Sequence, residues 1–172
     1  ALLNKLIEMG GNIQVSNHSS FGKEPIADIN VKSSILNACE VTSDDVPNLI
    51  DELPILFIAC SFAKGSSVFN DIEELKHKES DRLKAMQEGL NKMKIKNFLK
   101  GNVFCIEGMG KDYKSPNLLA ETYFDHRIAM SFAIAGLNSS PSIEIDSPES
   151  INTSFPEFID LGKKLGCNFE IS

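Results

Sequence analysis

Internal repetition is the feature of this sequence that most constrains its fold, because repeats decide architecture before individual elements do. Residues 6–15, 90–106 and 161–171 share one pattern: an amphipathic helix ends, usually at a glycine suited to a left-handed cap, and an alternating strand follows. Residues 51–71 and 125–146 share a second pattern, in which an Asp-capped apolar helix leads through a turn into a strand. We therefore expect a domain assembled from one repeated unit.

The two kinds of helix predict different positions in that domain. Residues 55–63 and 128–137 are apolar nearly all round, so these helices should be buried, whereas the amphipathic helices should lie outside. The predicted unit is buried helix, strand, outer helix and strands. One copy of the unit is complete near residues 47–107, the copy at residues 1–41 lacks its beginning, and the copy at residues 125–172 ends early. This order predicts an α/β fold, with loops at residues 108–122 and 16–24.

Composition excludes several classes of function. A net charge of −7 argues against non-specific binding to nucleic acid or to an anionic membrane, since both need a surplus of Lys and Arg. The longest apolar stretch, residues 55–63, is too short to span a bilayer. The first residues have no initiator Met and resemble the middle of a helix, so we expect the chain to come from a longer protein.

The four cysteines are far apart and have no metal-ligand spacing. Cys39, Cys60, Cys105 and Cys167 each lie within or beside an apolar stretch. We expect them to be small buried hydrophobic residues of a protein in a reducing compartment, the cytoplasm.

The densest charged segment is residues 73–83, and it has two interpretations. A helix start at Ser80 or Asp81 predicts a solvated charged segment that leads into a core-facing helix. If the helix extends back to Lys78 instead, Lys78 and Arg82 stand at i and i+4, where like charges cost about 0.2 to 0.5 kcal/mol. An anion between them would reverse the sign, and a nearby helix N-terminus would add to its binding.

Two more helix starts carry candidate residues. Asp51 and Asp125 each precede an apolar helix, where structural capping is the default role of a carboxylate. Arg127 would stand in the positive first turn of its helix, which is unfavourable unless an acidic partner or an anionic ligand compensates. His126 has no second His or Cys at ligand spacing, so we expect a packed histidine and no metal site.

Four motifs in register resemble one family. KESDRL at residues 78–83 and DHRIAM at residues 125–130 resemble two signatures of the 5-enolpyruvylshikimate-3-phosphate (EPSP) synthases. DELP at residues 51–54 resembles their helix start in the form shared by the glyphosate-tolerant bacterial class, and SFPEF at residues 154–158 resembles their C-terminal motif. The order and the separation of the first two motifs also match, and the resemblance runs from about residue 1 to the end.

The resemblance implies a fold and partners. The family fold has two similar lobes, each built from three βαβαββ units around buried helices, and both substrates bind between the lobes. Residues 1–172 would be the C-terminal lobe, without the short N-terminal stretch that completes it and without the second lobe. The partners would be shikimate 3-phosphate and phosphoenolpyruvate, with no nucleic acid and no membrane, and the complete protein would be a monomer.

The resemblance also implies a reaction and site residues. The family joins the enolpyruvyl group of phosphoenolpyruvate to the 5-hydroxyl of shikimate 3-phosphate by addition and elimination, in the shikimate pathway of aromatic amino-acid biosynthesis, with no cofactor. By resemblance Asp51 binds shikimate 3-phosphate and exchanges the hydroxyl proton, and Glu79 exchanges the C3 proton. Lys78, Arg82 and Arg127 would hold phosphoenolpyruvate, the two arginines chiefly by its carboxylate.

One position departs from the family, and two alternatives stay open. Many members carry Lys two residues before the Phe-Pro of the last motif, whereas Thr153 and Ser154 precede Phe155 here, so we assign no ligand there. The sister transferase acting on UDP-N-acetylglucosamine shares the architecture but lacks the two charged signatures. A non-catalytic binding module is the other alternative, because half of the family's active site lies outside this sequence.

Overall fold

The computed structural model describes residues 1–140 and 142–170, and one complete repeat unit occupies its middle. This unit consists of β3 (Glu40–Val41), α2 (Val46–Leu49), α3 (Leu53–Ser61), β4 (Lys64–Asn70), the 3-10 helix η1 (Glu73–His77), α4 (Arg82–Lys92), β5 (Asn97–Lys100) and β6 (Val103–Met109). It is preceded by α1 (Leu2–Glu8), β1 (Asn12–Phe21) and β2 (Glu24–Lys32). It is followed by β7 (Leu118–Ala120), α5 (His126–Gly136), β8 (Ile143–Ile145), the 3-10 helix η2 (Pro148–Thr153) and α6 (Phe158–Lys164).

Strand pairing confirms the repeat. β3 pairs in parallel with β4 across helix α3, and β7 pairs in parallel with β8 across helix α5. Two antiparallel hairpins, β1–β2 and β5–β6, follow the outer helices α1 and α4. The middle unit is therefore βαβαββ, with the αββ part of a unit before it and the βαβα part of another after it. The predicted α/β fold of repeated βαβαββ units is confirmed.

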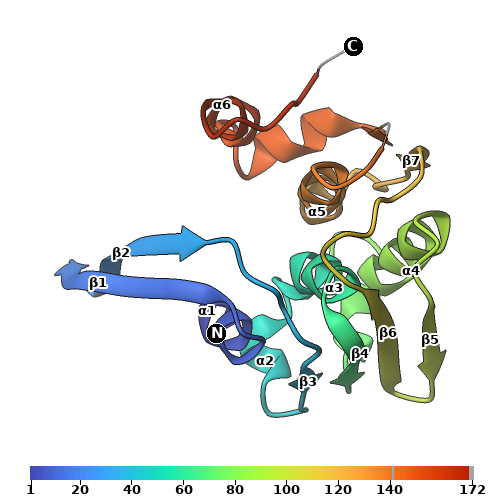
Figure 1. Ribbon diagram of the computed structural model, residues 1–172, viewed down its shortest axis with the longest axis horizontal. Helices are drawn as coiled ribbons and strands as arrows, with labels where there is room; N and C mark the ends of the chain where they lie inside the picture. The colour runs from blue at the N-terminus through green and yellow to red at the C-terminus, as the bar shows by residue number, and fades with distance from the viewer. Residues whose placement is uncertain (141, 171–172) are drawn as a thin grey trace.

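The buried helices pack at the centre of the fold, as their composition predicts. α3 contacts α5, and the two lie between the four-stranded sheet β3-β4-β6-β5 and the C-terminal segment (Figure 1). Phe57 of α3 contacts Phe69 of β4 and Phe104 of β6, at ring-centroid distances of 4.7 and 5.1 Å. All three rings are fully buried, so this aromatic cluster fixes α3 on the sheet.

A glycine sets how closely α4 approaches α5. A Cβ atom at Gly89 of α4 would lie 1.9 Å from Cζ of Phe132 of α5, so only glycine admits this ring. Leu83, Met86 and Leu90 complete the buried stripe of α4. The N-terminal ends of α4 and α5 also lie close together, since Nε of Arg82 is 2.8 Å from Oδ2 of Asp125.

Three segments differ from the prediction. Residues 16–24, predicted as a loop, belong to the β1–β2 hairpin, which projects from the rest of the fold (Figure 1). Ile13 and Val15 alternate with exposed neighbours, as predicted, but from Ser16 onward the side chains of β1 are exposed on both faces, as are those of β2 apart from Ala27, so no burial alternation marks this part of the hairpin. β4 begins at Lys64, within the predicted turn, since Gly65 adopts a φ of +94° and lets the strand pair from its first residue. β7 lies within the predicted loop at residues 108–122, where β8 supplies its partner.

The predicted last strand is wrong for its described part. Residues 167–170 form no strand; instead the ring of Phe169 packs against Gly162 and stacks on Phe158 of α6 at 5.7 Å. The half-buried ring therefore holds this segment against α6 in place of strand pairing. Pro141 of the predicted turn and Ile171 of the predicted strand lie outside the described residues.

The described chain contains no helix long and apolar enough to cross a membrane. Of the four cysteines, all free thiols, Cys39 and Cys60 are buried as predicted, whereas Cys105 and Cys167 are half-buried.

Candidate active site

Three helix N-termini surround the candidate site, and two of them are capped as predicted. Asp81 accepts a hydrogen bond from the backbone N–H of Lys84 at the start of α4, and Asp125 accepts one from the N–H of Arg127 at the start of α5. The capping role predicted for Asp51 is wrong. The cap of α3 is Glu52, which makes no side-chain cap bond, and the Asp51 carboxylate turns to cations instead. A carboxylate gains more Coulomb energy from a fully charged partner than from a neutral backbone N–H, so the cations decide its orientation.

Lys78 and Arg82 are close together, but not on one helix. Lys78 has extended backbone at the end of η1, and α4 begins at Arg82 with Asp81 as its cap, so the predicted helix start at Ser80 or Asp81 is confirmed and the alternative with Lys78 and Arg82 on one helix is wrong. The two cations nevertheless point at one anion. Nζ of Lys78 lies 3.7 Å and Nη1 of Arg82 lies 2.9 Å from Oδ1 of Asp51. In this structure the protein's own carboxylate takes the position between them.

Arg82 is the buried centre of the site. Its side chain is only 3% exposed and is surrounded by three carboxylates. Nε donates to Oδ2 of the fully buried Asp125 at 2.8 Å, Nη1 donates to Asp51 at 2.9 Å, and Nη2 lies 3.7 Å from Oε2 of Glu79. Ser80 adds a second donor to Asp125 at 3.0 Å. A guanidinium at this depth needs such partners, because an unpaired buried charge is costly.

Arg127 lies beside Asp51 in the first turn of α5. Its Nη1 donates to the backbone carbonyl of Asp51 at 2.9 Å and lies 3.8 Å from Oε1 of Glu52. The acidic partner that its unfavourable position requires is thus present. Both contacts run through Nη1 of a guanidinium that is 34% exposed, so its other two nitrogens can meet a ligand.

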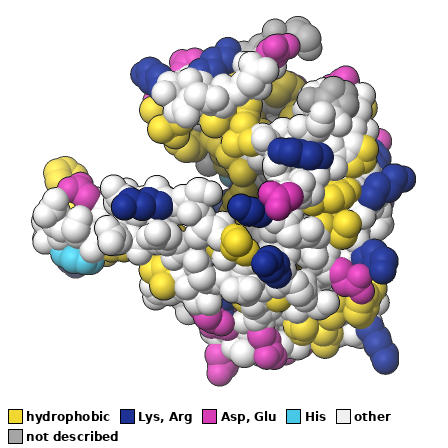
Figure 2. Space-filling view, in the orientation of Figure 1, with side chains coloured by type: hydrophobic (Ala, Val, Ile, Leu, Met, Phe, Trp, Pro, Cys, Tyr) yellow, Lys and Arg dark blue, Asp and Glu magenta, His cyan; other side chains and the backbone are white. Residues whose placement is uncertain are grey.

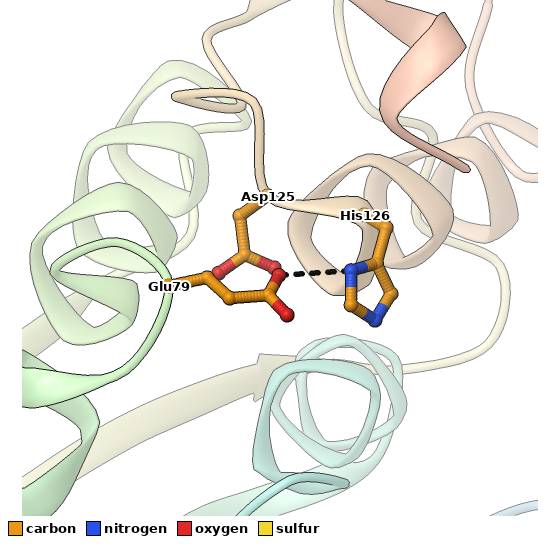
Figure 3. Close-up of side chains that lie close together, drawn as sticks. All are labelled: Glu79, Asp125 and His126. Atoms are coloured by element: carbon orange, nitrogen blue, oxygen red, sulfur yellow. Dashed lines mark ion pairs between the residues drawn. The ribbon is translucent and has the colours of Figure 1, made fainter. Parts of the chain in front are cut away.

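Glu79 faces His126 across the two helix starts. Oε2 of Glu79 lies 2.8 Å from Nδ1 of His126, and Asp125 lies beside the pair (Figure 3). The histidine is buried, as predicted, but it has a carboxylate partner that the sequence did not indicate.

These three residues offer metal-ligand atoms within 4.8 Å of one another. However, Oδ1 of Asp125 already accepts the N–H of Arg127, and Oδ2 accepts from Ser80 and Arg82. The carboxylate is therefore occupied by hydrogen bonds next to a buried cation, an arrangement that disfavours a bound metal ion.

The cations also set the ionisation of Asp51. Burial raises its pKa, but the charges of Lys78, Arg82 and Arg127 together with the hydrogen bond from Arg82 outweigh burial and lower the pKa below its usual value of 3.8. The pKa of Lys78 is raised, first by its hydrogen bond to Glu74 at 2.8 Å and then by the charge of Asp51, against the effect of burial. Asp51 is consequently ionised and Lys78 charged near neutral pH.

The structure brings all five sequence-predicted site residues into one cluster, since Asp51, Lys78, Glu79, Arg82 and Arg127 are linked by these contacts. Sequence reasoning missed their partners. Asp125 was expected only as a cap, and Glu52, Glu74 and the Glu79–His126 pair were not expected at all. The one available signal was the acidic run around residues 73–79, because a buried or crowded cation needs anions nearby.

Solved structures define the class of fold. EPSP synthase from Acinetobacter baumannii superimposes with a TM-score of 0.94 at 41% identity, covering 99% of this chain and 40% of that chain. The enolpyruvyl transferase NikO from Streptomyces tendae superimposes with a TM-score of 0.66 at 16% identity, a likeness of fold alone. The fold is that of an enolpyruvyl transferase.

Sequence comparison identifies the family. The family described as EPSP synthase (3-phosphoshikimate 1-carboxyvinyltransferase) matches residues 1–161, so the chain belongs to the EPSP synthase family. It is 44% identical to the 3-phosphoshikimate 1-carboxyvinyltransferase of Zymomonas mobilis over 99% of this chain, and 40% identical to that of Ruthia magnifica over 95%. The chain spans 38% and 37% of these relatives, respectively.

Proposed function

We propose that the whole protein containing this chain is a 3-phosphoshikimate 1-carboxyvinyltransferase, which transfers the enolpyruvyl group of phosphoenolpyruvate to the 5-hydroxyl of shikimate 3-phosphate. One observation carries the proposal: three cations and two exposed carboxylates, on segments far apart in the sequence, converge where α3, α4 and α5 begin. Such a cluster suits two anionic substrates and proton exchange between them. The names of the matched relatives favour this activity over transfer to UDP-N-acetylglucosamine.

Each residue has a role in this proposal. Lys78, Arg82 and Arg127 hold phosphoenolpyruvate, with Arg82 offering Nη1 and Nη2 because Asp125 occupies its Nε. Asp51, ionised near neutral pH, binds shikimate 3-phosphate and accepts the proton of its 5-hydroxyl as the oxygen attacks C2 of phosphoenolpyruvate. Glu79 protonates C3, which gives a tetrahedral ketal phosphate. Glu79 then removes a C3 proton as phosphate leaves beside Lys78. This route needs no metal and no organic cofactor.

We further propose that residues 1–172 are the C-terminal lobe of a two-lobed enzyme. An apolar groove runs between α1, α3 and α5, lined by Leu2, Leu6, Ile55, Ile58, Ala59, Phe62, Ile134 and Asn138. Hydrophobic side chains gather in a hollow on this face above the β1–β2 hairpin (Figure 2). The groove can accept the buried helix that the first repeat unit needs.

This lobe supplies one face of the site, so the isolated chain should release no phosphate from the two substrates. Turnover by pure residues 1–172 would contradict the division into lobes.

The location and the oligomeric state belong to the same proposal. Four free thiols suit a reducing compartment, so we propose that the protein acts in the cytoplasm. We also propose a monomer, in which the site lies between two lobes of one chain. Light scattering of the full-length protein tests this state.

The experiment on function uses Glu79→Gln in the full-length protein. This change keeps the shape but prevents proton exchange, so turnover should fall by about 10²- to 10⁴-fold while both substrates still bind. Exchange of the C3 hydrogens of phosphoenolpyruvate with deuterium from solvent should fall with it. Glu107→Gln is the matched control, because Glu107 is also an exposed carboxylate in an ion pair, with Lys96.

Two outcomes would contradict the proposal. A Glu79→Gln variant with normal turnover and normal hydrogen exchange would leave Glu79 as a structural partner of His126 and Arg82. A wild-type protein that binds both substrates but releases no phosphate would be a non-catalytic binding module.

A further inference from the structure

Two cysteines outside the candidate active site form a buried thiol pair. Cys39 directly precedes β3, and Cys60 lies in the last turn of α3. Their Sγ atoms are 3.8 Å apart, within hydrogen-bond reach of each other. The pair lies at the C-terminal end of α3, whereas Asp51 precedes its N-terminal end. The pair therefore lies outside the cluster proposed for catalysis.

The two thiols are not equivalent. Cys39 retains 8% of its surface and Cys60 has none, so a reagent from solvent meets Cys39 first. A hydrogen bond from Cys60 lowers the pKa of Cys39, helped by the nearby charge of Lys5 and opposed by burial. The same hydrogen bond, together with burial, raises the pKa of Cys60 well above its usual value. The environment thus favours Cys39 as the attacking thiolate and Cys60 as the neighbouring thiol that resolves the mixed disulfide.

The backbone around the pair holds it in this arrangement. The N–H of Cys39 donates to Oγ of the buried Ser67, and the N–H of Val68 donates to the carbonyl of Cys39. Nζ of Lys5 donates to the carbonyl of Glu40 at 3.0 Å, which keeps a cation next to Cys39. These bonds fix one cysteine on the edge of β4 while α3 holds the other, so the two sulfurs stay neighbours.

We propose that Cys39 and Cys60 form a reversible disulfide with a low-molecular-weight disulfide such as oxidised glutathione. The Cys39 thiolate attacks one sulfur of the reagent, which breaks the S–S bond and releases one thiolate. Cys60 then gives up its proton and attacks the Cys39 sulfur, releasing the second thiolate and closing the protein disulfide. The reagent gains two electrons, the protein loses two, and the two protein thiol protons end on the two released thiols.

Closing the bond requires only a local movement. The sulfurs must approach from 3.8 Å to about 2.05 Å, a shift that side-chain rotation and small backbone adjustment can supply. The two cysteines are 21 positions apart, so the disulfide closes a loop of the unfolded chain. This should raise the melting temperature of the oxidised protein by about 3 to 8 °C.

A tryptic digest tests the proposal, because Lys32 and Lys64 bound a peptide that contains both cysteines. The full-length protein is equilibrated in glutathione buffers of decreasing reduced-to-oxidised ratio, then alkylated and digested. We expect peptide 33–64 to change from two alkyl groups to none, with the loss of two hydrogens in mass, and to revert with reductant. Cys105 and Cys167 lie on other tryptic peptides and report on the reactivity of unpaired thiols in the same sample.

Variants separate the two steps. With Cys60→Ala, Cys39 should stop at the mixed disulfide with glutathione; with Cys39→Ala, Cys60 should stay unmodified and the oxidative rise in melting temperature should vanish. Cys105→Ala is the matched control and should behave like wild type. The proposal fails if peptide 33–64 keeps two free thiols at every ratio, or if Cys39 carries glutathione in the wild type without closure.

Discussion

Replacement of Arg127 by alanine tests whether the cation cluster binds a ligand or only supports the fold. The Arg127 guanidinium is 34% exposed, and its contacts with the carbonyl of Asp51 and the carboxylate of Glu52 both use Nη1. A ligand carboxylate can therefore approach the remaining nitrogens without displacing the bond to Asp51. Arg127→Ala removes the proposed ligand contact and one structural hydrogen bond together, so the two effects must be measured separately.

The expected magnitudes differ for binding and for stability. Loss of a charge-assisted contact to a carboxylate costs about 1.5 to 3 kcal/mol, which corresponds to about a 10- to 150-fold rise in the Kd for phosphoenolpyruvate. Loss of the bond to the Asp51 carbonyl should reduce the free energy of unfolding by about 0.5 to 1.5 kcal/mol. Arg127→Lys keeps the charge but loses the two parallel N–H donors of the guanidinium. Its affinity for phosphoenolpyruvate should therefore lie between those of wild type and Arg127→Ala.

The assay is a pair of titrations of the full-length protein, one with each substrate, alongside urea unfolding. Lys100→Ala is the matched control, since it removes an exposed cation from the β5–β6 hairpin and leaves the cluster intact. Equal losses of affinity for phosphoenolpyruvate and shikimate 3-phosphate would refute the reasoning. That result would mean that Arg127 acts by positioning Asp51 through its carbonyl.

Two further predictions concern stability. Because cations lower the pKa of Asp51, the stability contributed by its ionised form is present above the usual value of 3.8 and is lost as the pH falls through the lowered value in the folded protein. The difference in unfolding free energy between wild type and Asp51→Asn should thus be constant above pH ~5 and shrink below it, as urea titrations at each pH will show. Gly89→Ala should destabilise the protein by about 1 to 3 kcal/mol despite the better helix propensity of alanine, because its Cβ would meet the ring of Phe132. Thermal unfolding measures this loss, and a second change of Phe132→Leu should recover part of it.

The parts of the structure that sequence predicted are those fixed by neighbouring residues. The caps of α4 and α5 depend on Asp81 and Asp125 and on N–H groups two or three positions away. The burial of α3 and α5 follows from side chains that are apolar around each helix. Their recurrence with the outer helices was enough to predict the α/β repeat.

The missed parts depend on partners far away in the chain. The β1–β2 hairpin is exposed on both faces from Ser16 onward, so this part lacks the alternation that marks a half-buried strand. Arg82 and Asp125 are 43 positions apart, and no local pattern indicates that they meet. Asp51 had a plausible cap pattern, but the cations brought by two other segments bind it more strongly than a backbone N–H would.

The pairing within the cluster explains how an acidic chain can present a site for anions. Arg82 has one buried partner, the fully buried Asp125, which is shielded from solvent and keeps the guanidinium oriented. Its other partners, Asp51 and Glu79, are 45% and 52% exposed, so they are the ones that an incoming anion can displace or share. Under the proposed function, ligand binding would be an exchange of one anion for another around cations already in position. The affinity would be the difference between the contacts that the cations make with the ligand and those that they make with Asp51 and Glu79. These two carboxylates are also the groups proposed to transfer protons.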